Sequence, residues 1–172
     1  IEIQREIPPG HTYQDHPDIV ARVFWLKFKA LMDDIVKHKI FGPVQAFVWR
    51  IEWQARGLPH VHLLVILVNS IRSTREIDAV VSAEIPDPQL FPELYCVVQE
   101  FQLHSPCDQN PSAGCRDNSK HSCKRHFPKD MARLTSIAGN KYPKYRRRGR
   151  FACEVNGRII TDDWVVPYNP FL

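Results

Sequence analysis

The sequence contains no uninterrupted run of the roughly 18 apolar residues that a membrane-spanning helix requires. Its first residues are charged and rich in proline, unlike a secretory signal peptide. The phosphate-binding pattern G-x-x-x-x-G-K-[ST] is also missing, as are internal repeats and low-complexity tracts. We therefore expect no membrane partner, no secretion and no nucleotide-driven motor within these residues.

Cysteine is sparse and odd in number, with five in 172 residues. An odd count does not suit a disulfide scaffold, so we expect a reducing, intracellular setting. The chain is 44% hydrophobic, which is enough for one substantial core. A single domain is therefore the default expectation.

The formal net charge of +4 is unevenly distributed. Residues 116–150 carry twelve Lys and Arg against two acidic residues, so the rest of the chain is acidic. A one-sided basic block is typical of a protein that binds a polyphosphate; the alternative is a solvated or disordered basic loop. Cations interleaved with aromatic residues favour single-stranded DNA as the partner. The candidate contacts are Lys141, Tyr142, Lys144, Tyr145, Arg146, Arg147, Arg148 and Arg150.

Hydrophobic periodicity and helix signals predict an α+β fold. The predicted helices are 17–39, 73–81 and 92–103; the predicted strands are 44–54 and 60–68, with short strands near 151–154 and 158–161. Residues 1–16 are expected to be irregular. Both faces of strand 60–68 are apolar beyond its histidines, which is typical of a central strand covered on both sides.

A candidate metal site lies on the two longer predicted strands. His60 and His62 are two residues apart, so their side chains point to one face and can share a divalent ion. Glu52 and Gln54 lie on the preceding strand, and residues 56–59 suit a hairpin turn that returns their oxygens to the histidines. Such a ligand set favours a metal that polarises a phosphate oxygen. Chance alone produces roughly 0.4 His-x-His pairs here, and the alternative is two hydrogen-bonded histidines on a buried strand.

A second candidate metal site has the spacing H-x2-C-x7-C-x7-C, in a segment with few apolar residues. Its members are His104, Cys107, Cys115 and Cys123. Tetrahedral zinc would supply the folding energy that this segment otherwise lacks. The alternatives are three unrelated thiols, or His121 or His126 as the fourth ligand. Cys96 and Cys153 lie in apolar patterns and are expected to be buried thiols.

The block from Glu52 to His62 closely resembles the HUH motif of rolling-circle replication initiators. Its Gln-x-Arg-Gly-Leu-Pro-His form resembles the Rep domain of eukaryotic Helitron transposons, the Helitron helicase-like domain family. Further blocks are similar to that family in the same order: Pro17–Phe24, Ser82–Pro88, Phe101–Cys107, Cys123–Lys129, Tyr142–Arg148 and Trp164–Pro170.

The resemblance implies an antiparallel HUH-type sheet with flanking helices and a small zinc-binding insertion. The implied segments are a partial nuclease core at 1–103, a zinc-binding and DNA-contact segment at 104–150, and C-terminal strands at 151–172. The implied activity is nicking and transfer of single-stranded DNA through a phosphotyrosine intermediate. Mg²⁺ or Mn²⁺ would be held by His60, His62 and either Glu52 or Gln54, and Zn²⁺ by the Cys/His set. A covalently attached helicase domain and a nuclear location follow from the same resemblance.

The tyrosine nucleophile of this family lies on a helix after the block that matches Trp164–Pro170. None of the chain's tyrosines matches that motif: Tyr13, Tyr95, Tyr142, Tyr145 and Tyr168. We therefore expect an internal fragment that binds metal and DNA but does not nick by itself. The main alternative is a domesticated, non-catalytic zinc and DNA-binding module; an unrelated metal hydrolase is a third reading.

Overall fold

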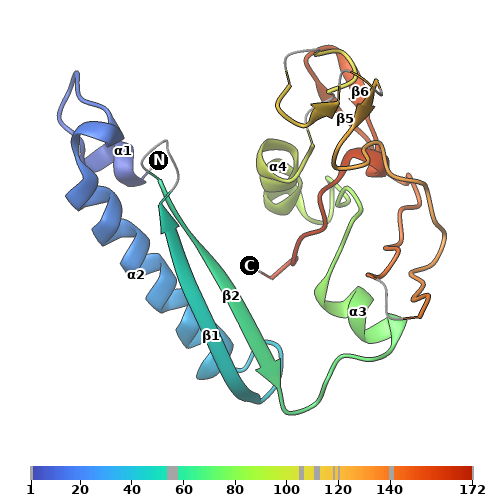
Figure 1. Cartoon of the computed structure of the whole chain (residues 1–172), viewed down its shortest axis with the longest axis horizontal. Helices are drawn as coiled ribbons and strands as arrows, with labels where there is room; N and C mark the ends of the chain where they lie inside the picture. Colours follow the sequence, from blue (N-terminus) through green and yellow to red (C-terminus); the bar gives the residue numbers. More distant parts are fainter. Residues whose placement is uncertain are drawn as a thin grey trace. The chain divides into compact units, whose positions relative to one another are not determined.

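The computed structural model describes residues 2–53, 58–104, 107–110, 113–117, 119, 121–139 and 142–171 (Figure 1). It has the predicted α+β composition, and its strands pair antiparallel in three small two-stranded sheets. The chain forms two compact units, Ile1–Ile71 and Arg72–Leu172, rather than the expected single domain. No helix among the described residues is both long enough and apolar enough to cross a membrane.

Helix α2 is the main helix of the first unit and spans Pro17–Val36. Proline suits the first helical position because its missing N–H would have no partner there. Val20, Phe28 and Ile35 recur at helical spacing and are buried. The helix ends three residues before the predicted 39. A short helix, α1 (Glu2–Glu6), and a 3-10 turn, η1 (Tyr13–Asp15), occupy part of the segment that was expected to be irregular.

Strands β1 (Val44–Trp53) and β2 (Pro59–Leu67) form an antiparallel hairpin beside α2 (Figure 1). The Trp49 ring lies 5.8 Å from that of Trp25 and 5.3 Å from that of Phe28, so one face of the hairpin packs on the helix.

The other face of the hairpin carries exposed apolar residues, including Val48, Leu64 and Ile66. In the described residues β2 pairs with β1 alone, so the expectation of a central strand is wrong there. Apolar residues on both faces of a strand indicate burial only where a second layer of structure covers each face. No described residue of the first unit forms such a layer over Val48, Leu64 and Ile66.

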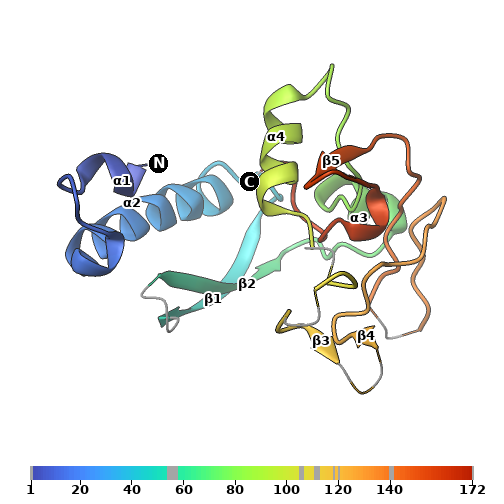
Figure 2. The same ribbon diagram turned by 90° about the horizontal axis from the view of Figure 1, so that it is seen from above.

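The second unit is built from short elements. They are α3 (Thr74–Val80), α4 (Pro92–Phe101), β3 (Arg116–Asp117), β4 (Ser122–Cys123), β5 (Cys153–Val155), β6 (Arg158–Ile160) and η2 (Asp162–Trp164). Ser73 caps α3 in a reciprocal capping box with Glu76, as the spacing predicts. Figure 2 shows β3 and β4 as a small hairpin of this unit.

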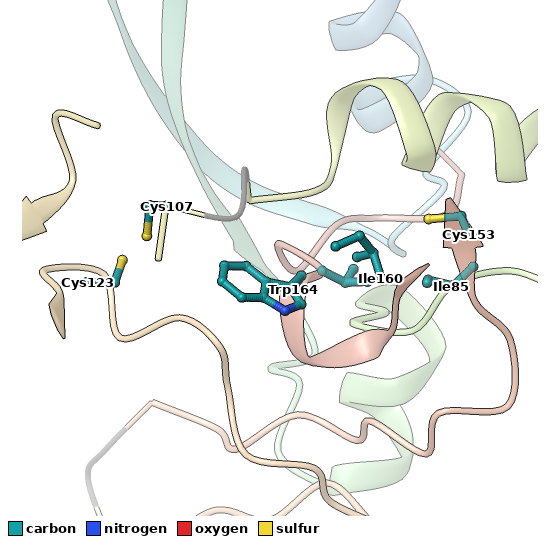
Figure 3. Packing of buried hydrophobic residues seen from close by; sticks show 7 residues of the cluster. Ile85, Cys107, Cys123, Cys153, Ile160 and Trp164 are labelled. Carbon is teal, nitrogen blue, oxygen red and sulfur yellow. The ribbon is translucent and has the colours of Figure 1, made fainter. Parts of the chain in front are cut away.

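The core of the second unit joins residues from distant parts of the chain (Figure 3). Its buried members are Ile85, Cys107, Cys123, Cys153, Ile160, Trp164 and Val165. Backbone bridges tie the irregular segments to one another, pairing Ser82 with Tyr168, Leu103 with Val165, Ala132 with Arg147 and Ser136 with Lys144. Cys153 is buried as expected, whereas Cys96 is exposed on α4, because a short helix that packs on one side turns some of its apolar residues outward.

Candidate metal centres

The hairpin register brings together a carboxylate and two histidines. Glu52 lies directly opposite His60, and His62 is two residues further along the same face. The Nε2 atoms of His60 and His62 are 2.8 Å apart. One Glu52 carboxylate oxygen lies 3.2 Å from the His62 Nε2 and 3.6 Å from that of His60. Three potential ligand atoms therefore converge on one point.

The geometry of this group fits a divalent ion. Two ligand atoms that each lie about 2.1 Å from one ion, at right angles, are about 3 Å apart. Among the described residues, the polar contacts of the His60 ring are through Nε2, because its buried Nδ1 has no hydrogen-bond partner there. The Glu52 and His62 side chains are well exposed, which leaves room for a further ligand of a bound ion. Gln54, the competing ligand, lies outside the described residues.

The second candidate site is assembled from three separate stretches of the second unit. The ligand atoms of His104, Cys107, Cys115 and Cys123 all lie within 4.8 Å of one another. The His104 Nε2 is 3.4 Å from the sulfur of Cys115 and 3.4 Å from that of Cys123. Tetrahedral zinc bonds of ordinary length place such atoms about 3.6 Å apart. This Cys3His cluster can hold a metal ion such as zinc.

The surroundings of the Cys3His cluster favour a structural ion. Cys107 and Cys123 are buried, and their sulfur atoms face one another beside Trp164 (Figure 3). Burial, with the neighbouring thiols, raises the pKa of Cys107 to about 12. Burial also lowers the pKa of His104, as do the nearby Lys129 and Arg125, which keeps the imidazole in the neutral form that metals require.

The alternative ligands His121 and His126 do not join the cluster that the described residues form. Both side chains are exposed, and both residues have left-handed backbone conformations, with φ of 48° and 58°. Backbone turns at these residues direct the chain around the site, whereas His104 supplies the nitrogen that faces the sulfurs.

The predicted DNA-contact residues fall into two groups. The first group, Arg146, Arg147 and Arg148, makes contacts within the second unit, and Arg147 is buried there. Arg147 is only 4% exposed, and its guanidinium donates to the carbonyls of Ala83, Val165 and Asp162. Through these bonds the Arg147 side chain connects its own loop to the segments that contain Ala83 and Asp162–Val165.

The neighbours of Arg147 are also engaged within the unit. Arg146 pairs with Asp78 and Glu84 at 3.2 and 3.1 Å, and Arg148 donates twice to Glu84 at 2.6 Å each. Local charge density could not reveal these pairings, because the acidic partners lie more than 60 residues upstream. In the described structure these arginines stabilise the fold, and they are not a free basic surface.

The second group of predicted DNA-contact residues remains accessible. Arg150 and Lys144 are exposed, and Lys144 pairs with Asp130 at 3.0 Å. Tyr142 is 95% exposed, while Tyr145 is half-buried and burial raises its pKa. Lys141 lies outside the described residues.

A cavity of about 650 Å³ opens beside these residues, and some of its lining residues were not among the predicted DNA contacts. Arg125, Phe127 and Lys129 line it together with Tyr142, Lys144 and Tyr145. The basic residues that follow Cys123 could have suggested an anion-binding site in the sequence. Their position beside Tyr142 and Tyr145, however, depends on how the loops fold.

The similarity of this chain to a known protein family lies within the first unit. Residues 1–65 match the model of one family, described as the Helitron helicase-like domain at the N-terminus. The match includes α2, β1 and all three members of the Glu52–His60–His62 group. It confirms the resemblance for this part of the chain, while the blocks after residue 65 lie beyond it. None of the curated proteins matches the chain.

Proposed function

We propose that this chain is the metal-binding part of a rolling-circle transposon Rep domain that nicks and transfers single-stranded DNA in the nucleus. The tyrosine that attacks the DNA belongs to a segment outside these residues, and a helicase domain is covalently attached in the parent protein. The observation that carries the proposal is the convergence of Glu52, His60 and His62 within the part that matches the Helitron helicase-like family.

Each residue of this group has a distinct task. The two histidine nitrogens and one carboxylate oxygen would hold Mg²⁺ or Mn²⁺ at the surface of the hairpin. When bound, the ion would polarise the scissile phosphate, whose negative charge otherwise repels a nucleophile. Because β1 and β2 are paired through the whole site, the hairpin keeps the ligands in place before DNA arrives.

The experiment measures Mn²⁺ binding to the zinc-loaded chain by electron paramagnetic resonance. We expect His62→Ala to weaken binding at least about tenfold, because one of three protein ligands is lost. His38→Ala is the matched control: His38 also contacts a carboxylate, 2.9 Å away on Asp34, but no third potential ligand joins them among the described residues. Equal Mn²⁺ affinity in His62→Ala and the wild type would contradict the proposal.

A nicking assay tests the division of the active site. Single-stranded DNA incubated with the chain and Mn²⁺ should give no covalent protein–DNA adduct, because the nucleophile is assigned to another segment. An adduct mapped to one of the chain's own tyrosines would overturn that assignment.

One alternative is a non-catalytic zinc and DNA-binding module. The observation that favours it is the Cys3His cluster, which lies in a hydrophobic core and does not involve the histidine pair. Metal content separates the two functions: a chain that binds one zinc tightly and no Mn²⁺ at all supports the module.

A further inference from the structure

We propose that the cavity beside Tyr142 binds one unpaired nucleotide of a DNA single strand, with its base on the tyrosine and its phosphate on Arg125 and Lys129. The choice of DNA rests on the proposed function. The cavity lies wholly within the second unit and contains none of the Glu52–His60–His62 group.

The size of the cavity suits a nucleotide. Its volume of about 650 Å³ is within the range of roughly 300–1,000 Å³ that small-molecule sites occupy. It is open on one side, so a nucleotide can enter while its neighbours in the strand remain outside. A base in a duplex would have to leave its stack to enter, and that cost favours a single strand.

The charge in the cavity suits a phosphate. Arg125 and Lys129 have no carboxylate partner among the described residues. Among the described residues, the one carboxylate that lines the cavity, Asp130, is paired with Lys144. Arg147 also lines the cavity, but it is only 4% exposed and its Nη1 donates to the carbonyls of Asp162 and Val165. A phosphate would therefore meet two cations whose charge no carboxylate balances.

The position of Lys129 is set by its contacts. Its ammonium group donates to the backbone carbonyl of Arg125 at 2.6 Å and lies 4.8 Å from the centre of the Phe127 ring. These contacts hold the ammonium at the cavity while leaving further donors for a ligand. The Phe127 ring stacks in turn on His104, with the ring centres 4.3 Å apart. The wall of the cavity is thus connected to the Cys3His cluster.

Tyr142 provides the surface for a base. A tyrosine that is 95% exposed contributes little to packing, yet this one lines the cavity beside the half-buried Tyr145. Aromatic rings next to a basic groove are what single-strand binding proteins use, because every base can stack on a ring face. The structure therefore explains an exposed aromatic side chain that the fold does not need.

The experiment measures the affinity of the zinc-loaded full chain for a fluorescein-labelled dT12 by fluorescence anisotropy. We expect Tyr142→Ala to weaken binding about tenfold and Tyr142→Phe to keep it, because the ring and not the hydroxyl makes the stack. Arg125→Ala should weaken binding and lower the slope of log affinity against log salt by about one. Arg133→Ala is the matched control, because this exposed arginine lies in the same segment but not in the cavity.

A second probe separates base from phosphate. A dodecamer of abasic sites keeps the phosphates, so the wild type should bind it about tenfold more weakly than dT12. Tyr142→Ala should bind the two probes equally. Wild-type affinity for dT12 in both Tyr142→Ala and Arg125→Ala would overturn the cavity site while leaving the proposed function in place.

Three further outcomes also overturn the inference. If Arg133→Ala loses as much affinity as Arg125→Ala, the basic segment acts as a diffuse surface. If U12 binds more tightly than dT12 with the same dependence on Tyr142, the ligand is RNA. If the wild type binds Mn²⁺ in a His62-dependent way but does not bind dT12, the cavity site fails and the hairpin metal site remains.

Discussion

The two ligand clusters differ in how the chain assembles them. Glu52, His60 and His62 lie on one hairpin, within eleven residues of sequence, and face solvent. The Cys3His cluster draws on three stretches between residues 104 and 123, and two of its sulfurs are buried in a hydrophobic core. An exposed cluster on a preformed hairpin can exchange ligands, whereas an enclosed one holds loops together.

The units that carry these clusters differ in the same way. The first has long helical and strand elements whose backbone bonds are satisfied locally. Among its described residues, the second has short elements, four isolated bridges and several ion pairs. Its stability therefore depends more on specific side chains, and the following predictions test that dependence.

The largest effect is expected for Cys107→Ser. The substitution removes one of four ligands from a buried site, and structural zinc contributes directly to folding free energy. We expect loss of the bound zinc and a fall in the free energy of unfolding of the second unit by about 5 kcal/mol or more. Metal analysis and hydrogen exchange, read separately for the two units, measure both quantities.

Two controls sharpen that comparison. Cys96→Ser changes an exposed thiol outside the cluster and should keep the zinc. His62→Ala should leave the free energy of unfolding within about 0.5 kcal/mol, because the side chain is exposed. If His62→Ala destabilised the protein as much as Cys107→Ser, the distinction between a surface site and a structural site would fail.

An intermediate effect is expected for Arg147→Met. The change leaves the carbonyls of Ala83, Asp162 and Val165 without their buried donor and should cost about 3 kcal/mol. Arg150→Ala, at an exposed site in the same basic run, should cost no more than about 0.5 kcal/mol. Denaturant unfolding at pH 7 measures both. Unchanged stability in Arg147→Met, with weaker DNA binding, would contradict the structural role and favour the prediction that this arginine contacts DNA.

A smaller effect is expected for Ser73→Ala at the start of α3. The Ser73 hydroxyl accepts from the Glu76 backbone N–H at 3.2 Å, and losing such a cap typically costs about 1 kcal/mol. The backbone N–H of Ser73, followed by its hydroxyl, lowers the pKa of Glu76 from 4.5 to about 2.

This pKa makes the cap dependent on pH. The folded-state pKa is depressed, so the contribution of Glu76 is complete above about pH 4.5 and is lost as the pH falls through about 2. Unfolding curves of the wild type and Ser73→Ala should therefore lie closer together near pH 2 than at pH 7. A constant separation across that range would show that the carboxylate does not stabilise the cap.

Local sequence patterns were sufficient for the helices and for the hairpin. Pro17 and the periodicity that follows it place α2 within three residues at its C-terminal end. Alternation along two strands is enough to put His60 and His62 on one face, because side chains in a strand alternate strictly. The cysteine spacing likewise selected the four residues whose ligand atoms the structure brings together.

Local patterns do not reveal partners that lie far apart in the chain. Arg146 and Arg148 look like a surface for DNA, but Glu84 binds both of them from more than 60 residues away. Cys96 looks buried, yet it lies on the outer side of a short helix. Exposure and ion pairing depend on which segments meet, and a linear pattern does not contain that information.

Local sequence patterns specify the helix α2, the hairpin on which the candidate metal ligands converge, and the capped helix α3. These features depend on backbone periodicity and on contacts a few residues apart. Tertiary contacts determine which basic residues pair with carboxylates within the fold, and they bring Arg125 and Lys129 to the same cavity as Tyr142. These contacts form only when long loops close and buried polar groups find their partners at the same time. They therefore depend on residues that are far apart in the sequence.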